Sequence, residues 1–358
     1  MKIPRLPLIL TITLVFGLLL SSCTGAAPIN TWPGLSAGEN VVYLAYQTGV
    51  FAVNVDSGSM TWRYPDKADN AKSFYASPAV TADQVVAGSY SHAVYSLELA
   101  SGAQRWEFAS EIGFHFVASP LVVNNIVLAP SSDYSLYALD QNGKKLWSFK
   151  TKNVLWAQPA SDGELVYLPA MDHNLYALRL SDGSEAWRTD LGSSMLSGAV
   201  LDDGVLYVNT MSGKVFAVNA ADGKTLWSQD VGEKTWASPL LHEGNLYFGT
   251  SAGNVIALNT AAGVAPTARV LWKVAIDGAV IGAGAVTSKS LVFVTETGTV
   301  QALSFGGEKL WSQKVSGKLY TTPVVVNDTL VVASTGGDAL LTAFNVDGGQ
   351  KWLFTVPK

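Results

Sequence analysis

The sequence has a single cysteine, Cys23, and few charged residues. One cysteine excludes an internal disulfide and a cysteine-based zinc site. Charged residues make up 14% of the 358 residues, compared with about 25% in an average globular protein. The 23 Lys and Arg against 28 Asp and Glu give a formal net charge of −5, without a basic cluster. A nucleic-acid-binding protein carries a basic face, so no nucleic acid is expected among the partners.

Long apolar runs are also missing, apart from residues 6–20, which follow the basic residues Lys2 and Arg5. This run is too short to span a bilayer comfortably and has the length of a signal peptide's apolar region. It ends in Leu20-Ser-Ser-Cys23, which resembles the cleavage site of bacterial lipoproteins. We therefore expect a lipoprotein signal peptide over residues 1–22, and a lipidated Cys23 with a short linker over residues 23–32.

A lipid on Cys23 would anchor the protein to a membrane outside the cytoplasm. Thr24 follows this cysteine, where an aspartate would resemble a signal for retention in the inner membrane. In a bacterium with two membranes we expect the outer membrane, facing the periplasm. In a bacterium with one membrane we expect its outer face.

Tryptophan recurs with a spacing of 39–45 residues through the rest of the chain. The eight repeated residues are Trp62, Trp106, Trp147, Trp187, Trp227, Trp272, Trp311 and Trp352. Glycine lies four residues before seven of them. The exception is Trp272, whose unit holds an insertion at residues 264–268. Such self-similarity is typical of a repeat architecture.

Each unit of about 40 residues contains four short strand-like segments separated by turn residues. In the fifth unit these are residues 197–201, 205–209, 214–219 and 225–228. Four strands per repeat are typical of a propeller blade. The sequence therefore predicts an all-β, eight-bladed β-propeller over residues 33–358, with four antiparallel strands per blade. We expect the eight repeated tryptophans to be structural residues that pack between adjacent blades.

Two of the repeat motifs are Asp56-Ser-Gly58-Ser-Met-Thr-Trp62 and Ala221-Asp-Gly223-Lys-Thr-Leu-Trp227. They resemble the tryptophan-docking repeat of the pyrroloquinoline-quinone-type propellers, over essentially all of residues 33–358. Together with the lipoprotein signal, eight bare blades resemble the BamB-type outer-membrane assembly lipoproteins. This resemblance implies a membrane-anchored protein-interaction scaffold that acts in envelope protein assembly.

The partner-binding loops of that family are not recognisable in this chain. The family carries a Leu-Arg-Gly segment and two aspartates one residue apart. Here Leu178-Arg179 is not followed by glycine, and no Asp-x-Asp occurs. The resemblance therefore does not transfer a partner site.

The pyrroloquinoline-quinone-type propellers also include quinone-dependent dehydrogenases, which carry inserted loops and calcium-ligating carboxylates. The connections here are short, and Asp133, Asp172 and Asp338 are isolated in sequence. Such carboxylates are expected to cap turns.

The histidines are expected at surfaces or turns. His92 and His173 hold equivalent places in blades two and four, and His115 and His242 have no partner in sequence. We predict no enzyme activity, no cofactor and no metal. A quinone-dependent dehydrogenase and a carbohydrate- or small-ligand-binding propeller are the alternative functions.

A candidate binding site lies at the start of the blades. Most units open with a proline, Pro33 in unit one among them, and Gly198 and Gly284 are taken to replace it in units five and seven. Three residues before this position stand the aromatics Tyr75, Trp156, Trp236 and Tyr320 in blades two, four, six and eight, and the aliphatics Val117, Met195 and Ile281 in the blades between. First strands line a propeller's channel. We predict an aromatic ring at one channel mouth that binds an envelope protein or peptide; packing between blades is the alternative.

Overall fold

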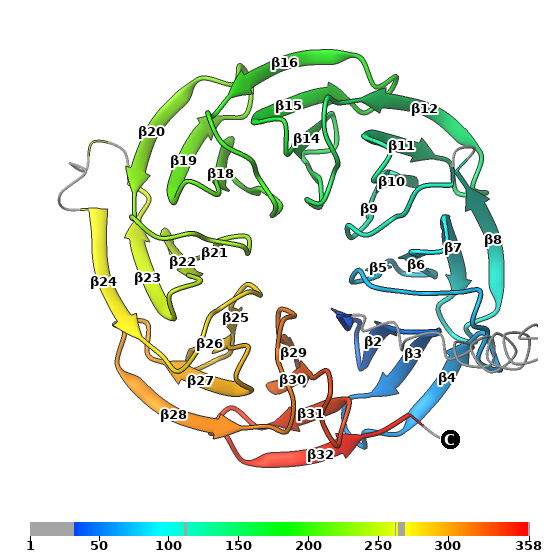
Figure 1. The fold of residues 1–358 in the computed structure, drawn as a ribbon, viewed down its shortest axis with the longest axis vertical. Coiled ribbons are helices and arrows are strands. Elements are labelled where there is room, and N and C mark those ends of the chain that lie inside the picture. The colour runs from blue at the N-terminus through cyan, green and yellow to red at the C-terminus, as the bar shows by residue number, and fades with distance from the viewer. Residues whose placement is uncertain (1–31, 111–112, 262, 264–268, 357–358) are drawn as a thin grey trace, which may run out of the picture. The chain divides into compact units, whose positions relative to one another are not determined.

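The computed structural model describes residues 32–110, 113–261, 263 and 269–356. Thr31–Lys358 forms one compact unit. Its 32 strands make eight four-stranded sheets, arranged as blades around a central channel (Figure 1). In every sheet the strands follow chain order and pair antiparallel. The predicted all-β, eight-bladed propeller is confirmed.

The blades follow one another along the chain. Blades one to four are formed by β1 (Gly34–Ala37), β2 (Val41–Tyr46), β3 (Gly49–Asn54) and β4 (Met60–Tyr64); β5 (Ala79–Val80), β6 (Gln84–Gly88), β7 (Ala93–Glu98) and β8 (Gln104–Ala109); β9 (Leu121–Val123), β10 (Ile126–Pro130), β11 (Ser135–Leu139) and β12 (Lys145–Lys150); β13 (Ala160–Ser161), β14 (Leu165–Pro169), β15 (Asn174–Arg179) and β16 (Glu185–Asp190). Blades five to eight are formed by β17 (Val200–Asp202), β18 (Val205–Asn209), β19 (Lys214–Asn219) and β20 (Thr225–Asp230); β21 (Leu240–His242), β22 (Asn245–Gly249), β23 (Asn254–Asn259) and β24 (Val270–Ala275); β25 (Ala285–Val286), β26 (Leu291–Val294), β27 (Thr299–Leu303) and β28 (Lys309–Lys314); β29 (Val324–Val326), β30 (Thr329–Ala333), β31 (Leu341–Phe344) and β32 (Gln350–Phe354).

The position of a strand within its blade decides its burial. The two middle strands are buried on both faces, as in β6 and β11. The fourth strands run along the outside of the ring and alternate between exposed and half-buried residues, as in β16. The apolar faces of neighbouring sheets pack together, so a single blade could not bury its own core.

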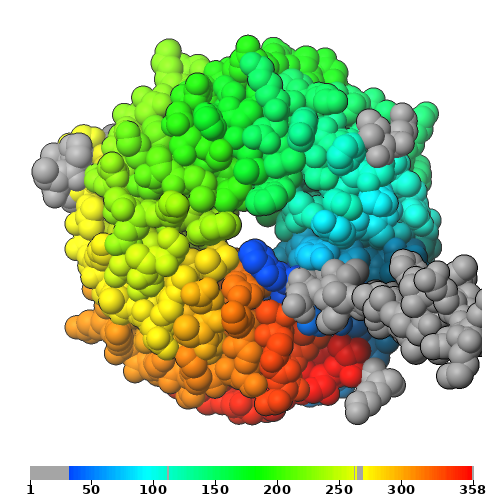
Figure 2. Space-filling model, in the orientation of Figure 1, coloured from blue at the N-terminus to red at the C-terminus, as the bar shows by residue number. Residues whose placement is uncertain are grey.

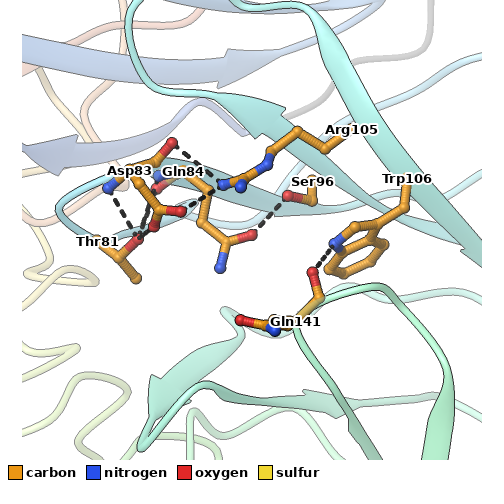
Figure 3. A network of polar contacts seen from close by, with 7 residues as sticks. All are labelled: Thr81, Asp83, Gln84, Ser96, Arg105, Trp106 and Gln141. Atoms are coloured by element: carbon orange, nitrogen blue, oxygen red, sulfur yellow. Dashed lines mark hydrogen bonds and ion pairs between the residues drawn. The ribbon is translucent and has the colours of Figure 1, made fainter.

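Seven of the eight repeated tryptophans dock on the next blade in the same way. Each indole Nε1 donates a hydrogen bond of 2.7–3.0 Å to a backbone carbonyl of the neighbouring third-to-fourth-strand turn. Figure 3 shows Trp106 donating to the carbonyl of Gln141. The ring also covers the glycine of that turn, where a Cβ would come within 2.5–2.8 Å of ring atoms. The pairs are Trp62–Gly102, Trp106–Gly143, Trp147–Gly183, Trp187–Gly223, Trp272–Gly307, Trp311–Gly348 and Trp352–Gly58.

Trp227 differs because of the insertion in blade six. A Cβ at Gly263 would meet no atom within 4 Å, so this glycine does not receive a docking ring. The buried guanidinium of Arg269 lies 4.0 Å from the centroid of the Trp227 ring instead. A cation–π contact therefore replaces the glycine docking at the interface of blades five and six.

Candidate binding site at the channel mouth

The register of the sheets defines one equivalent position in each blade. In each sheet, the repeated tryptophan of the fourth strand pairs with a residue of the third strand, and the pairing continues across the second strand to the first. This row of paired residues ends on Ser36 in blade one, Ala79 in blade two and Val200 in blade five. The residue four places before the end of this row lies in the segment that leads into the first strand. Across the eight blades these residues, which we call the channel rim, are Trp32, Tyr75, Val117, Trp156, Leu196, Trp236, Ile281 and Tyr320.

The register corrects the predicted ring in two blades. Met195 is fully buried, and Leu196 holds the rim position of blade five. The reason is that Ala199, rather than Gly198, stands at the place of the unit-opening proline. In blade one, Leu35 rather than Pro33 holds that place, so Trp32 belongs to the rim and was missed. The aromatics therefore occupy blades one, two, four, six and eight, and the sequence had predicted no rim residue for blade one.

All eight rim residues line one cavity of about 500 Å³ at the channel. Figure 2 shows this channel open in the middle of the ring. The remaining lining comes mainly from small and hydroxyl-bearing residues, such as Ser77, Ser119 and Ser238. Within the described part of the chain, no charged side chain lines this cavity. Such a surface favours an uncharged or weakly polar ligand group.

The aromatic rim residues are accessible to solvent to different degrees. Trp32 and Trp156 each expose 48% of their surface, and Tyr75, Trp236 and Tyr320 are half-buried. None of these five rings is therefore buried completely between blades. Trp32 stacks on Tyr320 with ring centroids 4.8 Å apart. Burial raises the pKa of the Tyr75 phenol, which keeps its hydroxyl neutral.

Tyr75 begins a row of rings that leaves the rim along the same face. Tyr75 lies 5.0 Å from Tyr90, Tyr90 stacks on His115 at 3.6 Å, and His115 stacks on His92 at 4.8 Å. His115, which has no partner in sequence, is thus placed between residues of blade two. His92 sits in a turn with a φ of 73°, a left-handed conformation that Tyr134 and His173 also adopt in blades three and four. Blades five, six and seven have glycine at this position. Because His92 lies in a turn, no repeated spacing in the sequence indicated its contact with His115.

Two of the three candidate carboxylates hold turns. Asp133 accepts hydrogen bonds from the backbone of Ser135 and the hydroxyl of Tyr137. Asp172 is bound in the same way by Asn174 and Tyr176. Asp338 lies in the exposed turn before β31. Among the described residues, no three His, Cys, Asp or Glu side chains form a group suited to a metal ion.

The remaining sequence predictions concern the N-terminal segment. Cys23 and the expected signal peptide lie outside the described residues. In the part of the chain that is described, no helix has the length and apolar character needed to cross a membrane.

Solved structures with this architecture come from several functional classes. BamB from Moraxella catarrhalis superposes with a TM-score of 0.73 at 19% identity, over 87% of this chain and 95% of that chain. A europium-containing methanol dehydrogenase superposes with a TM-score of 0.71 at 13% identity, over 89% of this chain and 85% of that chain. Likeness at such low identity shows the fold alone.

A curated relative covers a smaller part of the chain. The serine/threonine-protein kinase AfsK of Streptomyces griseus is 31% identical over 114 residues. The match spans 31% of this chain and only 14% of the kinase.

One family model matches nearly the whole propeller. The model described as outer membrane protein assembly factor BamB matches residues 46–195, 171–265 and 262–357. These overlapping matches follow the repeated blades and agree with the solved BamB structure in fold. The chain therefore belongs to the family of the outer membrane protein assembly factor BamB.

Proposed function

We propose that this protein is a lipid-anchored scaffold outside the cytoplasm, which holds an envelope protein or peptide at the aromatic channel rim and catalyses no reaction. Membership of the BamB family supports a protein-interaction scaffold at the cell envelope. The observation that carries the proposed site is the set of five accessible aromatic rings around one uncharged mouth.

The composition of the rim suits a protein interface. Tryptophan and tyrosine provide large, rigid contact surfaces with few rotatable bonds, and they dominate binding hot spots. Trp156 and Trp236 come from blades four and six and line the same cavity, so a segment inserted into the mouth could contact both rings. The surrounding hydroxyl groups offer hydrogen bonds to a peptide backbone.

The anchor rests on the sequence. The apolar run over residues 6–20 and the cleavage-site pattern at Cys23 support lipid modification. The segment from Thr24 to the propeller is short, so a lipid on Cys23 would keep the scaffold near the membrane.

The residues at the mouth do not fit the cofactor site of the quinone-dependent dehydrogenases. A calcium-bound quinone needs carboxylate ligands, and the cavity lining offers none among the described residues. We therefore favour binding over dehydrogenation.

A capture experiment with purified components tests this function. A partner is first identified by crosslinking in membranes, then purified and titrated against the protein. We expect Trp156→Ala with Trp236→Ala to weaken this binding at least about tenfold, the size of a hot-spot loss. Because Trp156 is half exposed, the melting temperature should change little.

The matched control changes Leu226→Ala and Leu310→Ala, which are 52% and 49% exposed on outer strands. This control should bind the partner normally. Equal weakening by both double variants would contradict a site at the rim. A second assay supplies calcium, a quinone and an alcohol or sugar. Reduction of an electron acceptor in this mixture would contradict the proposal that the protein catalyses no reaction.

A further inference from the structure

The chain joins the ring at the channel mouth and is fixed there. Trp32 stacks on Tyr320 of the last blade, and the hydroxyl of Thr321 donates a hydrogen bond to the carbonyl of Pro33. Pro33 and Gly34 are buried. Trp32, Pro33 and Gly34 therefore lie at the channel mouth, on the face of the ring that carries the rim.

The length of the preceding linker limits how the ring can face a membrane. Residues 24–32 span at most about 30 Å when fully extended. If the channel is to stay free for the rim, this linker could bring the opposite face to the bilayer only by running around the outer edge of the ring. Such a path crosses a blade of four strands about 4.8 Å apart and then follows an outer strand of about 20 Å. Its length is at least roughly 35 Å, before turns and side chains are added. A lipid on Cys23 therefore favours an orientation with the rim on the membrane side.

The same face carries all of the exposed aromatic side chains among the described residues. In an antiparallel blade, the turn between the second and third strands lies at the same end as the start of the first strand. Tyr90 and Tyr134 occupy such turns in blades two and three, and Phe114 lies in the connection between these blades. Each is 41% exposed. We call Tyr90, Phe114 and Tyr134 the outer aromatic patch.

The outer aromatic patch is held in place by backbone contacts. The amide of Tyr90 donates to the carbonyl of Ser73, and the carbonyl of Tyr134 accepts a hydrogen bond of 2.8 Å from the amide of Thr151. Ser110 donates to the carbonyl of Phe114. The stack on His115 also supports Tyr90. The backbone that carries the three rings is therefore held by hydrogen bonds.

We propose that the outer aromatic patch contacts the headgroup layer of the anchoring bilayer and turns the channel rim toward the membrane surface. This inference rests on the lipid anchor of the proposed function. Tyrosine and other amphipathic aromatic rings favour the membrane–water interface.

Vesicle binding without the lipid isolates the contribution of the patch. The mature chain from position 23 with Cys23→Ser is mixed with vesicles of phosphatidylcholine and phosphatidylethanolamine, and bound protein is measured by flotation. The patch variant carries Tyr90→Ser, Phe114→Ser and Tyr134→Ser. We expect it to bind at least about tenfold more weakly than the parent chain.

The control variant carries Leu146→Ser, Leu226→Ser and Leu310→Ser, which expose 49–52% of their surface on outer strands. It removes as many exposed apolar side chains from another part of the ring, and should bind like the parent chain. Failure of the parent chain to bind vesicles, or equal losses in the two variants, would overturn the inference.

The orientation is measured on the lipidated protein. Because Cys23 is the only cysteine and would carry the lipid, a single added cysteine can be labelled specifically. Ser212→Cys places a fluorophore in an exposed turn on the rim face, and Ala221→Cys places one in an exposed turn on the opposite face. We expect a headgroup acceptor to quench the label at position 212 more strongly; the reverse order would overturn the inference. Absence of lipid on Cys23 would refute the anchor, whereas the vesicle assay tests the patch independently.

Discussion

The tightest contacts of single residues are those between docking tryptophans and the glycines beneath them. Gly183 has a φ of 73°, and a Cβ there would lie 2.5 Å from the Trp147 ring. Two separate demands therefore apply: a left-handed backbone, which disfavours a side chain, and space for the indole. Glycine satisfies both, which explains why the motif keeps glycine and tryptophan in phase.

These two demands can be separated by a pair of substitutions. We expect Gly183→Ala to lower the free energy of unfolding by about 2–4 kcal/mol, because overpacking adds to backbone strain. Gly204→Ala has the same φ of 73° but open space around its Cβ, so it should cost only about 1 kcal/mol. Urea unfolding of both variants measures the difference. Equal costs would mean that the indole makes room for a methyl group.

At the scale of strands and turns, the carboxylate of Asp172 links blade four to the segment that carries Trp156. It accepts hydrogen bonds from the backbone of Lys152 and from the hydroxyl of Tyr176. Burial alone would raise the pKa of Asp172, but these hydrogen bonds outweigh it and hold the pKa below the ordinary value of 3.8. The ionised form is therefore part of the folded structure.

This linkage predicts a loss of stability in acid. Because the folded state lowers the pKa of Asp172, its contribution is fully present above about pH 4 and is lost as the pH falls further. We expect Asp172→Asn to reduce stability at pH 7 by about 1–2 kcal/mol. The difference from the parent protein should shrink below pH 4, as followed by thermal melting across pH. A difference that stays constant down to pH 2 would contradict this role.

The sequence predicted the strands and the docking tryptophans well, because both depend on local and repeated signals. Residues 205–209 and 214–219 were expected as strands and coincide with β18 and β19. The rim was harder to place. Gly198 was assigned the place of the opening proline from its phase in the repeat, but only cross-strand pairing fixes the register. The contact between His92 and His115 joins the turn between β6 and β7 to the connection between β8 and β9, and no spacing in the sequence encodes it.

At the scale of the whole molecule, the ring closes between the first and last blades without a shared strand. Trp352 donates a hydrogen bond of 2.7 Å to the carbonyl of Val55 and covers Gly58. The two blades also share a buried apolar cluster that includes Leu44 and Val331. Closure therefore uses the same docking as the other interfaces, but no peptide connection joins these two blades.

We expect this difference to appear when docking is weakened. Trp352→Ala and Trp311→Ala remove equivalent half-buried rings and should each cost about 2–4 kcal/mol. Only Trp352→Ala should expose the first and last blades to a protease under native conditions, because the other interfaces remain covalently connected. Limited proteolysis with mass spectrometry of the fragments distinguishes the two. Identical cleavage patterns would show that closure is no weaker than the internal interfaces.

Because each sheet takes its four strands from one continuous stretch, the order of the blades around the axis is independent of where the polypeptide is cut. Blades one and eight meet as any two neighbours do, so a connector like residues 191–199 could join β32 to β1. New termini could then be opened directly after β4, on the outside of the ring and before Tyr75. Such a circular permutant should keep every docking contact and the complete channel rim. Its tether would start from the outer edge of the ring, which would uncouple the orientation of the propeller from its binding surface.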